Sequence, residues 1–200
     1  MPAADLPPPR PHVADAKAAL RVQLRARRSR RPDAAGAAFA RGGWALAAGQ
    51  DAVALYASTG DEPDTWELLA RLHAAGVRVM LPVLAGRRHP DWAWYAGPDA
   101  LRPGWHGILE PTTAPLGAGA LASVSVVFCS ALAATPAGDR LGGGGGWYDR
   151  ALAHASGALV AALCFDEEVL PTLPTDPWDR RVDVVLTDRR TLRTATSGPE

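Results

Sequence analysis

Several features that define common protein classes are scarce or absent in this 200-residue chain. Its apolar runs are all shorter than the roughly 18 residues of a membrane span, so we expect a soluble protein without a membrane partner. The proline-rich amino terminus lacks the charge and apolar stretch of a secretory signal, which favours a cytoplasmic location. The only cysteines, Cys129 and Cys164, have no C-x-x-C spacing and no histidine cluster. They predict buried thiols in a reducing compartment and no structural zinc site.

Lysine is almost absent: Lys17 is the one lysine in the sequence, which has twenty arginines. A compact ammonium group on a flexible stem suits contact with phosphate as a point charge. Lys17 precedes Arg21 by one helical turn, which would place both cations on one face of a helix. The alternative is a chance remnant of a codon bias toward arginine and alanine.

Positive charge is concentrated near the amino terminus although the formal net charge is zero. The segment 10–31 holds seven arginines and Lys17 against one acid, Asp15. Such a segment binds an anion or nucleic acid, or forms a solvated helix face. No aromatic RNA-binding signature or zinc-finger spacing accompanies it, so a nucleic-acid partner is not predicted.

The length predicts a single domain over residues 13–195, with a disordered proline-rich lead at 1–12 and a tail at 196–200. Asp15 is a candidate cap for a helix that runs to about Ser29. Strand-like apolar runs alternate with helical segments along the rest of the chain. The expected helices are 34–48, 65–75 and 147–155, and the expected strands are 53–56, 77–81, 92–95, 124–128, 159–165 and 182–186, with 98–119 as a connection punctuated by glycine and proline. This alternation predicts an α/β fold whose mainly parallel sheet is covered on both faces.

Five consecutive glycines, Gly142 to Gly146, lie between Arg140 and the segment Trp147-Tyr148-Asp149-Arg150. Glycines between a strand and a helix let backbone N–H groups turn toward an anion. The flanking arginines add positive charge, and Asp149 is able to hold a cation. The pattern therefore indicates a phosphate-binding loop, with a flexible surface connection as the alternative.

This loop resembles the R-L-G-x-G-x-G-x-Y-D-R signature of the 5-formyltetrahydrofolate cyclo-ligase family. Other segments resemble family patterns in the same order from about residue 15 to 191. They are Lys17-x-x-x-Arg21, Glu62-Pro63-Asp64-Thr65, Gly107-Ile108-Leu109-Glu110-Pro111 and the proline-rich turn 173–183. The resemblance implies a three-layer αβα fold similar to the ribose-phosphate isomerase and CoA-transferase group.

The resemblance also implies an ATP-dependent ring closure of 5-formyltetrahydrofolate to 5,10-methenyltetrahydrofolate through a phosphorylated formyl group. Such phosphoryl transfer needs positioning and charge neutralisation more than a protein nucleophile. Lys17 and Arg140 are the catalytic candidates, and Asp149 with Asp179 are the candidate Mg²⁺ ligands. The candidate nucleotide contacts are Lys17, Arg21, Arg140, Gly142, Gly143, Gly144, Gly145, Gly146, Trp147 and Tyr148, and the candidate folate contacts are Thr59, Asp64, Gly144 and Trp147.

Several of these residues have structural alternatives. Asp64 is able to cap the helix that follows it instead of binding the pterin. Trp147 and Tyr148 are able to pack behind the loop, and Asp179 is able to pair with Arg180 or Arg181. Gly143 departs from the family pattern, which often has lysine, arginine or tyrosine there. This departure favours the second hypothesis, a nonenzymatic nucleotide or folate binder on the same scaffold. We expect a monomer.

Overall fold

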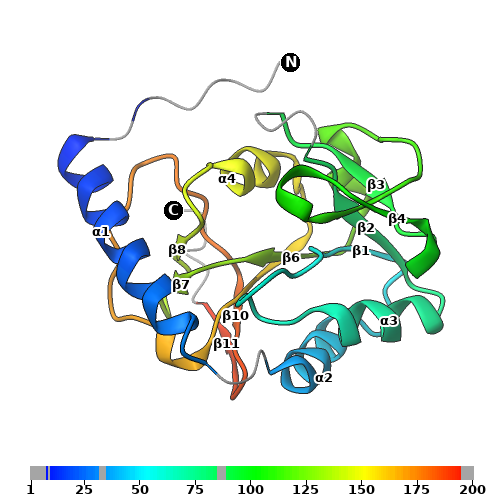
Figure 1. Ribbon diagram of the computed structural model, residues 1–200, viewed down its shortest axis with the longest axis horizontal. Coiled ribbons are helices and arrows are strands. Elements are labelled where there is room, and N and C mark those ends of the chain that lie inside the picture. Colours follow the sequence, from blue (N-terminus) through cyan, green and yellow to red (C-terminus); the bar gives the residue numbers. More distant parts are fainter. Residues whose placement is uncertain (1–7, 9, 32–34, 85–88, 195–200) are drawn as a thin grey trace.

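The computed structural model describes residues 8, 10–31, 35–84 and 89–194. A seven-stranded sheet in the order β11-β10-β9-β6-β1-β2-β3 forms its centre (Figure 1). The inner strands run parallel, whereas the edge strands β3 and β11 run antiparallel to their neighbours. The strands are β1 (Ala52–Ala54), β2 (Arg78–Pro82), β3 (Trp92–Trp94), β6 (Val126–Ser130), β9 (Leu159–Leu163), β10 (Val184–Leu186) and β11 (Thr191–Arg193).

Helices cover both faces of this sheet, as the alternation of elements predicted. α2 (Gly36–Ala47) and α3 (Trp66–Ala74) lie on the face below the sheet in Figure 1, and α4 (Trp147–Ala151) lies above it. Alternate residues of each strand enter the two cores, so Val53 packs on the α2–α3 side and Ala54 on the α4 side. The α/β class with a mixed, mainly parallel sheet is confirmed.

Two glycines inside α2 allow this helix to pack closely against its neighbours. A β-carbon at Gly42 would lie 2.3 Å from Cδ1 of Leu186, and one at Gly43 would lie 2.3 Å from Cδ2 of Leu68. Glycine lowers intrinsic helix stability, but here the missing side chains admit leucines from β10 and α3. The glycines that weaken the helix prediction therefore have a packing role.

The first helix, α1, spans Pro11–Arg28 and begins earlier than predicted. Asp15 lies inside it and is not its cap; Pro11 occupies the first turn, where its fixed φ and missing N–H are tolerated. Pro11 and His12 were assigned to the lead and belong to the helix. The remaining lead residues 1–7 and 9, and the tail 196–200, lie outside the described residues.

α1 packs on a small hairpin rather than on the central sheet. Fully buried Leu24 contacts the apolar cluster of Leu132, Ala133 and Leu141. The hairpin consists of the antiparallel strands β7 (Ala133–Ala134) and β8 (Arg140–Leu141), which lie beside α1 in Figure 1. Because β8 leads directly into the glycine run, this packing brings the basic helix next to the loop.

Three sequence predictions need correction. The connection 98–119, for which no strand was predicted, contains the antiparallel pair β4 (Leu101–Pro103) and β5 (Leu109–Pro111). A further strand, β11, follows the one predicted as last, and α4 is shorter than predicted because a 3₁₀ turn at Leu152–His154 continues it. The other 3₁₀ turns are Pro98–Ala100, Trp105–Gly107, Ala118–Ser123 and Asp166–Glu168.

Among the described residues, every helix is too short or too polar to cross a lipid bilayer.

Candidate functional site

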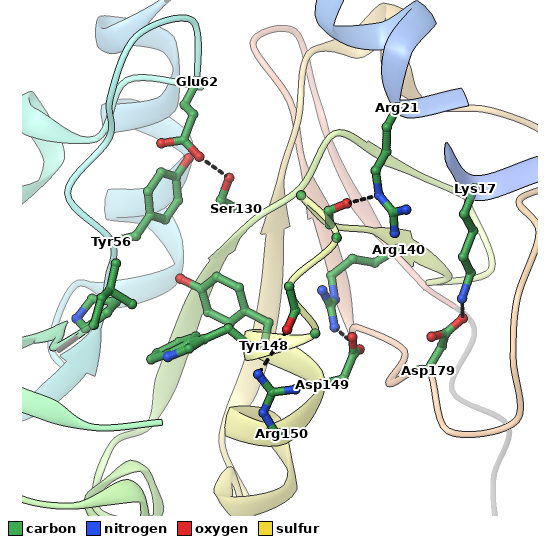
Figure 2. Close-up of a pocket in the computed structure, with 18 of the residues that line it drawn as sticks. Lys17, Arg21, Tyr56, Glu62, Ser130, Arg140, Tyr148, Asp149, Arg150 and Asp179 are labelled. Carbon is green, nitrogen blue, oxygen red and sulfur yellow. Dashed lines mark hydrogen bonds and ion pairs between the residues drawn. The ribbon is translucent and has the colours of Figure 1, made fainter. Parts of the chain in front are cut away.

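A cavity of about 750 Å³ lies between α1, the glycine run and the carboxyl ends of β1 and β6. Tyr56 follows β1 and Ser130 ends β6, and both side chains line the cavity. Ligands of open α/β sheets characteristically bind at this edge. Figure 2 shows Tyr56, Glu62 and Ser130 on one side of the cavity and the cations of α1 on the other, with Tyr148 between them.

Arginines hold the carbonyl groups of the glycine loop, which we define as Gly142–Gly146. Nε of Arg21 donates to the carbonyl of Gly142 at 2.9 Å, and Nη2 of Arg25 donates to that of Gly143 at 2.8 Å. Arg150 donates to the carbonyl of Gly145 at 2.9 Å. Gly144 has a φ of +111°, which strongly favours glycine. The loop therefore has a defined path fixed from two sides.

The ammonium of Lys17 lies between two carboxylates from the other end of the chain. Its Nζ is 2.9 Å from Oδ2 of Asp176 and 2.6 Å from Oδ2 of Asp179. The Asp176 side chain is fully buried, whereas that of Asp179 is 16% exposed. Burial alone would lower the pKa of Lys17, but the hydrogen bonds to these two acids outweigh it and raise that pKa. Lys17 is therefore a firmly protonated cation at the edge of the cavity.

Arg140 and Asp149 form an ion pair beneath the loop. Nη2 of Arg140 donates to Oδ1 of Asp149, and the backbone N–H of Arg180 approaches the same oxygen at 3.4 Å. The Arg140 side chain is only 2% exposed, and its Nε has no hydrogen-bond partner within the described residues. Burial followed by repulsion from Arg25 lowers the pKa of the neighbouring Arg21. Cations are therefore concentrated on this side of the cavity, which Lys17, Arg21, Arg25 and Arg140 all line.

The opposite side of the cavity carries an acid and aromatic rings. Oε1 of Glu62 accepts a hydrogen bond of 2.6 Å from the hydroxyl of Ser130 (Figure 2). Burial, and secondarily the charge of Glu62, raises the pKa of Tyr56, whose hydroxyl donates to the carbonyl of Pro63 at 2.9 Å. This side offers an anionic acceptor beside flat apolar surfaces.

Two predicted folate contacts do not line the cavity. Oδ1 of Asp64 accepts the N–H of Trp66 at 2.7 Å, so this carboxylate satisfies a free backbone donor at the start of α3. Thr59 donates its N–H to Oε2 of Glu62 at 3.0 Å. The cavity is lined by Glu62 from the same segment. The helix-start alternative thus describes Asp64, and Thr59 supports an acid that does face the cavity.

Trp147 and Tyr148 combine packing with exposure to the cavity. The ring of Trp147 lies edge-on to Trp92 and Tyr148, with centroid distances of 5.1 and 5.0 Å. The indole N–H of Trp147 and the hydroxyl of Tyr148 have no hydrogen-bond partner within the described residues. Both side chains therefore support the loop while leaving polar atoms unsatisfied beside the cavity.

The structure brings most of the candidate residues together. Lys17, Arg21, Arg140, Gly142, Gly143, Gly144, Gly145, Gly146, Trp147, Tyr148, Asp149 and Asp179 all line the cavity. Sequence reasoning missed Arg25, although its position four residues after Arg21 places it on the same helix face. It also missed Asp176, for which only the turn-like Thr175-Asp176-Pro177 sequence gave a signal.

The described residues contain no group of three or more His, Cys, Asp or Glu side chains arranged to hold a metal ion. A metal held here by Asp149 and Asp179 would need further oxygen ligands from a bound molecule or water, as Mg²⁺ commonly has.

Nearly the whole chain is similar to proteins of one family. A model of the 5-formyltetrahydrofolate cyclo-ligase family matches residues 13–188. The chain is 37% identical over 184 residues to the 5-formyltetrahydrofolate cyclo-ligase of Mycolicibacterium smegmatis, covering 87% of this chain and 94% of that protein. It is 30% identical over 147 residues to the Escherichia coli enzyme of the same name, covering 68% and 76% of the two chains.

Solved structures show the same fold. The 5,10-methenyltetrahydrofolate synthetase of Aquifex aeolicus superposes with a TM-score of 0.76 at 24% identity, covering 92% of this chain and 95% of that one. The corresponding protein of Mycoplasma pneumoniae gives a TM-score of 0.67 at 17% identity, covering 86% and 98%.

Proposed function

Because the chain belongs to the 5-formyltetrahydrofolate cyclo-ligase family, we propose that it converts 5-formyltetrahydrofolate and ATP to 5,10-methenyltetrahydrofolate, ADP and phosphate. The observation that carries this proposal is the two-sided cavity, with cations and the glycine loop on one side and Glu62 with aromatic rings on the other. A polyphosphate and a pterin need these two kinds of surface next to each other.

The cationic side suits the triphosphate. Lys17, Arg21 and Arg140 line it, and the buried Nε of Arg140 lacks a partner that an anionic oxygen would supply. Arg21 and Arg25 hold the carbonyls of Gly142 and Gly143 and so fix the path of the glycine loop. Peptide N–H groups of the loop would add donors to phosphate oxygens. In this arrangement Lys17 and Arg140 neutralise charge that develops on the transferring phosphoryl group.

Asp149 and Asp179 fit a Mg²⁺ ion that accompanies the nucleotide. Within the part of the chain that the structure describes, the hydrogen bonds to Asp149 use Oδ1 and those to Asp179 use Oδ2, so the other oxygen of each carboxylate is left for a ligand. Two carboxylates completed by phosphate oxygens and water match the preference of this ion. The metal would supply charge neutralisation on the phosphates.

The acidic side suits the pterin. A carboxylate accepts hydrogen bonds from neighbouring N–H groups of a flat heterocycle, and Glu62 is the acid that lines this side of the cavity. Ser130 and Thr59 orient Glu62, with donors at 2.6 Å and 3.0 Å to its two oxygens. We therefore assign to Glu62 the pterin-binding role that the sequence suggested for Asp64. Tyr56 and Tyr148 would contact the ring faces.

The proposed route balances without a protein nucleophile. The formyl oxygen attacks the terminal phosphorus of ATP and ADP leaves. The neighbouring folate nitrogen then attacks the activated carbon, the carbon–oxygen bond breaks, and phosphate departs with the proton of that nitrogen. The chain holds the reacting groups in line and excludes water from the phosphorylated formyl group. We expect this chemistry in a cytoplasmic monomer, and the unpaired buried thiols of Cys129 and Cys164 suit a reducing compartment.

The test is a turnover assay with purified protein, 5-formyltetrahydrofolate, ATP and Mg²⁺, followed by the absorbance of methenyltetrahydrofolate and by phosphate release. We expect equal amounts of both products and no product when ATP is omitted. Tight binding of both ligands without turnover would instead support the nonenzymatic binder.

A further inference from the structure

Three cations follow one another at one-turn intervals along the face of α1 that borders the cavity. They are Lys17, Arg21 and Arg25, and all three line the cavity. Lys17 pairs with acids, and Arg21 donates to the carbonyl of Gly142. Arg25 contacts no ligand in the function proposed so far, where it only holds the next carbonyl of the glycine loop.

The guanidinium of Arg25 occupies the space in which a side chain at position 143 would project. A β-carbon built on Gly143 meets one atom within 4 Å, which is Nη2 of Arg25 at 3.8 Å. The φ of Gly143 is not in the positive region, so a non-glycine residue is tolerated there without backbone strain. Gly144, with φ at +111°, would not accept one easily. Gly143 is therefore not required by the path of the loop.

We propose that Arg25 is a nucleotide-binding residue that supplies positive charge from α1 to the phosphate-binding side of the glycine loop, beside Gly143. This inference rests on the proposed function, because it assumes that the loop binds the triphosphate. Among the described residues, Arg25 donates one hydrogen bond, to the carbonyl of Gly143, and its guanidinium has five N–H donors, so others are able to contact a phosphate oxygen. The missing side chain at Gly143 then leaves room for the guanidinium of Arg25 beside the loop.

The same helix offers a matched control. Arg27 has the same charge, is exposed like Arg25, and does not line the cavity. Two residues along a helix rotate a side chain by about 200°, so Arg27 points away from the loop. An effect of general positive charge would appear in both variants, whereas a contact with the nucleotide would appear only at Arg25.

The test begins with calorimetric binding of ATP, which does not depend on turnover. Arg25→Ala should weaken ATP binding about tenfold, the loss expected for a hydrogen bond to a charged group, and Arg27→Ala should leave it unchanged. In steady state the KM for ATP should rise by a similar factor while the KM for 5-formyltetrahydrofolate stays within about twofold. A rise confined to the folate KM would overturn the proposal, because Arg25 would then bind the substrate carboxylates.

A charge-relocation variant completes the test. Adding Gly143→Lys to Arg25→Ala should recover at least half of the lost ATP affinity, because the lysine restores charge at the loop. Gly143→Gln in the same background is the uncharged control and should recover none. Equal ATP affinity of Arg25→Ala and Arg27→Ala would refute the proposal even if the wild-type protein is active. An inactive wild type that still loses ATP affinity on Arg25→Ala would instead refute only the proposed function.

Discussion

Arg28 and Glu168 form a two-pronged ion pair that is almost completely buried, with both N–O distances at 2.7 Å. Each side chain is only 2% exposed. Arg28 also donates to the carbonyl of Ala131, so this pair joins the end of α1 to the segments that follow β6 and β9. The orientation of the helix that carries Lys17 and Arg21 therefore depends on a contact outside the cavity.

Breaking this pair should destabilise the protein strongly. Arg28→Met leaves the carboxylate of Glu168 buried without its cation, and we expect the free energy of unfolding to fall by about 3 to 5 kcal/mol. Urea titration measures the change. The control is Arg190→Met, which removes a partly exposed pair with Asp166 and should cost no more than about 1 kcal/mol. Equal effects of the two substitutions would contradict the structural role of the buried pair.

Lys17→Ala should lower kcat/KM by about 100- to 200-fold, or about 3 kcal/mol, because it removes a charge beside the transferring phosphoryl group. The same change leaves Asp176 buried without its lysine, so stability should fall as well. The double variant Lys17→Ala/Asp176→Asn separates the two effects. It should regain thermal stability while remaining inactive, and near-normal turnover in either variant would exclude the catalytic role.

Glu62→Gln and Asp64→Asn distinguish the two acids of one segment. We expect Glu62→Gln to raise the KM for 5-formyltetrahydrofolate about tenfold or more, since it weakens an acceptor for the pterin, while the KM for ATP stays constant. Asp64→Asn should leave both KM values unchanged and change stability by no more than about 0.5 kcal/mol, because asparagine keeps a side-chain oxygen that accepts the N–H of Trp66. The reverse pattern in steady-state kinetics and melting curves would return the substrate role to Asp64.

Asp149→Asn should move the Mg²⁺ dependence of turnover to higher concentration by about tenfold or more, because one of the proposed carboxylate ligands loses its charge. The measurement is a Mg²⁺ titration at saturating ATP. Asp139→Asn is the matched control, since Asp139 pairs with Arg181 outside this cavity. An unchanged titration for Asp149→Asn would limit that residue to its pair with Arg140.

The folded protein should resist thiol reagents. Burial raises the pKa of Cys129 to about 11, so at pH 8 only about one thiol in a thousand is ionised. Burial also raises the pKa of Cys164 far above its usual range. A chromogenic disulfide should therefore react slowly with native protein and fully after unfolding in guanidinium. Fast reaction at pH 8 without unfolding would show that the α4 side of the core opens readily.

Local patterns predicted the parallel sheet and the glycine loop, because short apolar runs, helical spacing and glycine conformations depend on neighbouring residues. The start of α1 was misplaced because Asp15 resembles a cap, whereas Pro11 determines the first turn. The strand β11 was missed because its three residues, Thr191–Arg193, lie at an edge where no buried run marks them.

Contacts between distant segments could not be read from the sequence. Lys17 and Asp176 are 159 residues apart, and contacts of α1 with distant segments, among them its packing on the β7–β8 hairpin and the Arg28–Glu168 pair, bring them together. Which of the two acids, Glu62 or Asp64, is the better candidate for binding the pterin depends on which carboxylate faces the cavity. The two residues are only two positions apart, and the sequence pattern does not show which of them faces inward.

The placement of Lys17, Arg21 and Arg25 on one continuous helix has a consequence for how the gene can change. A one-residue insertion or deletion between Lys17 and Leu24 would rotate the preceding lysine by about 100° relative to the anchoring leucine and would shift it along the axis by about 1.5 Å. A substitution changes one of these side chains at a time, but a change of length in this stretch would move Lys17 out of contact with Asp176 and Asp179. Homologous lineages should therefore keep this spacing free of gaps even where the amino acids between the cations vary.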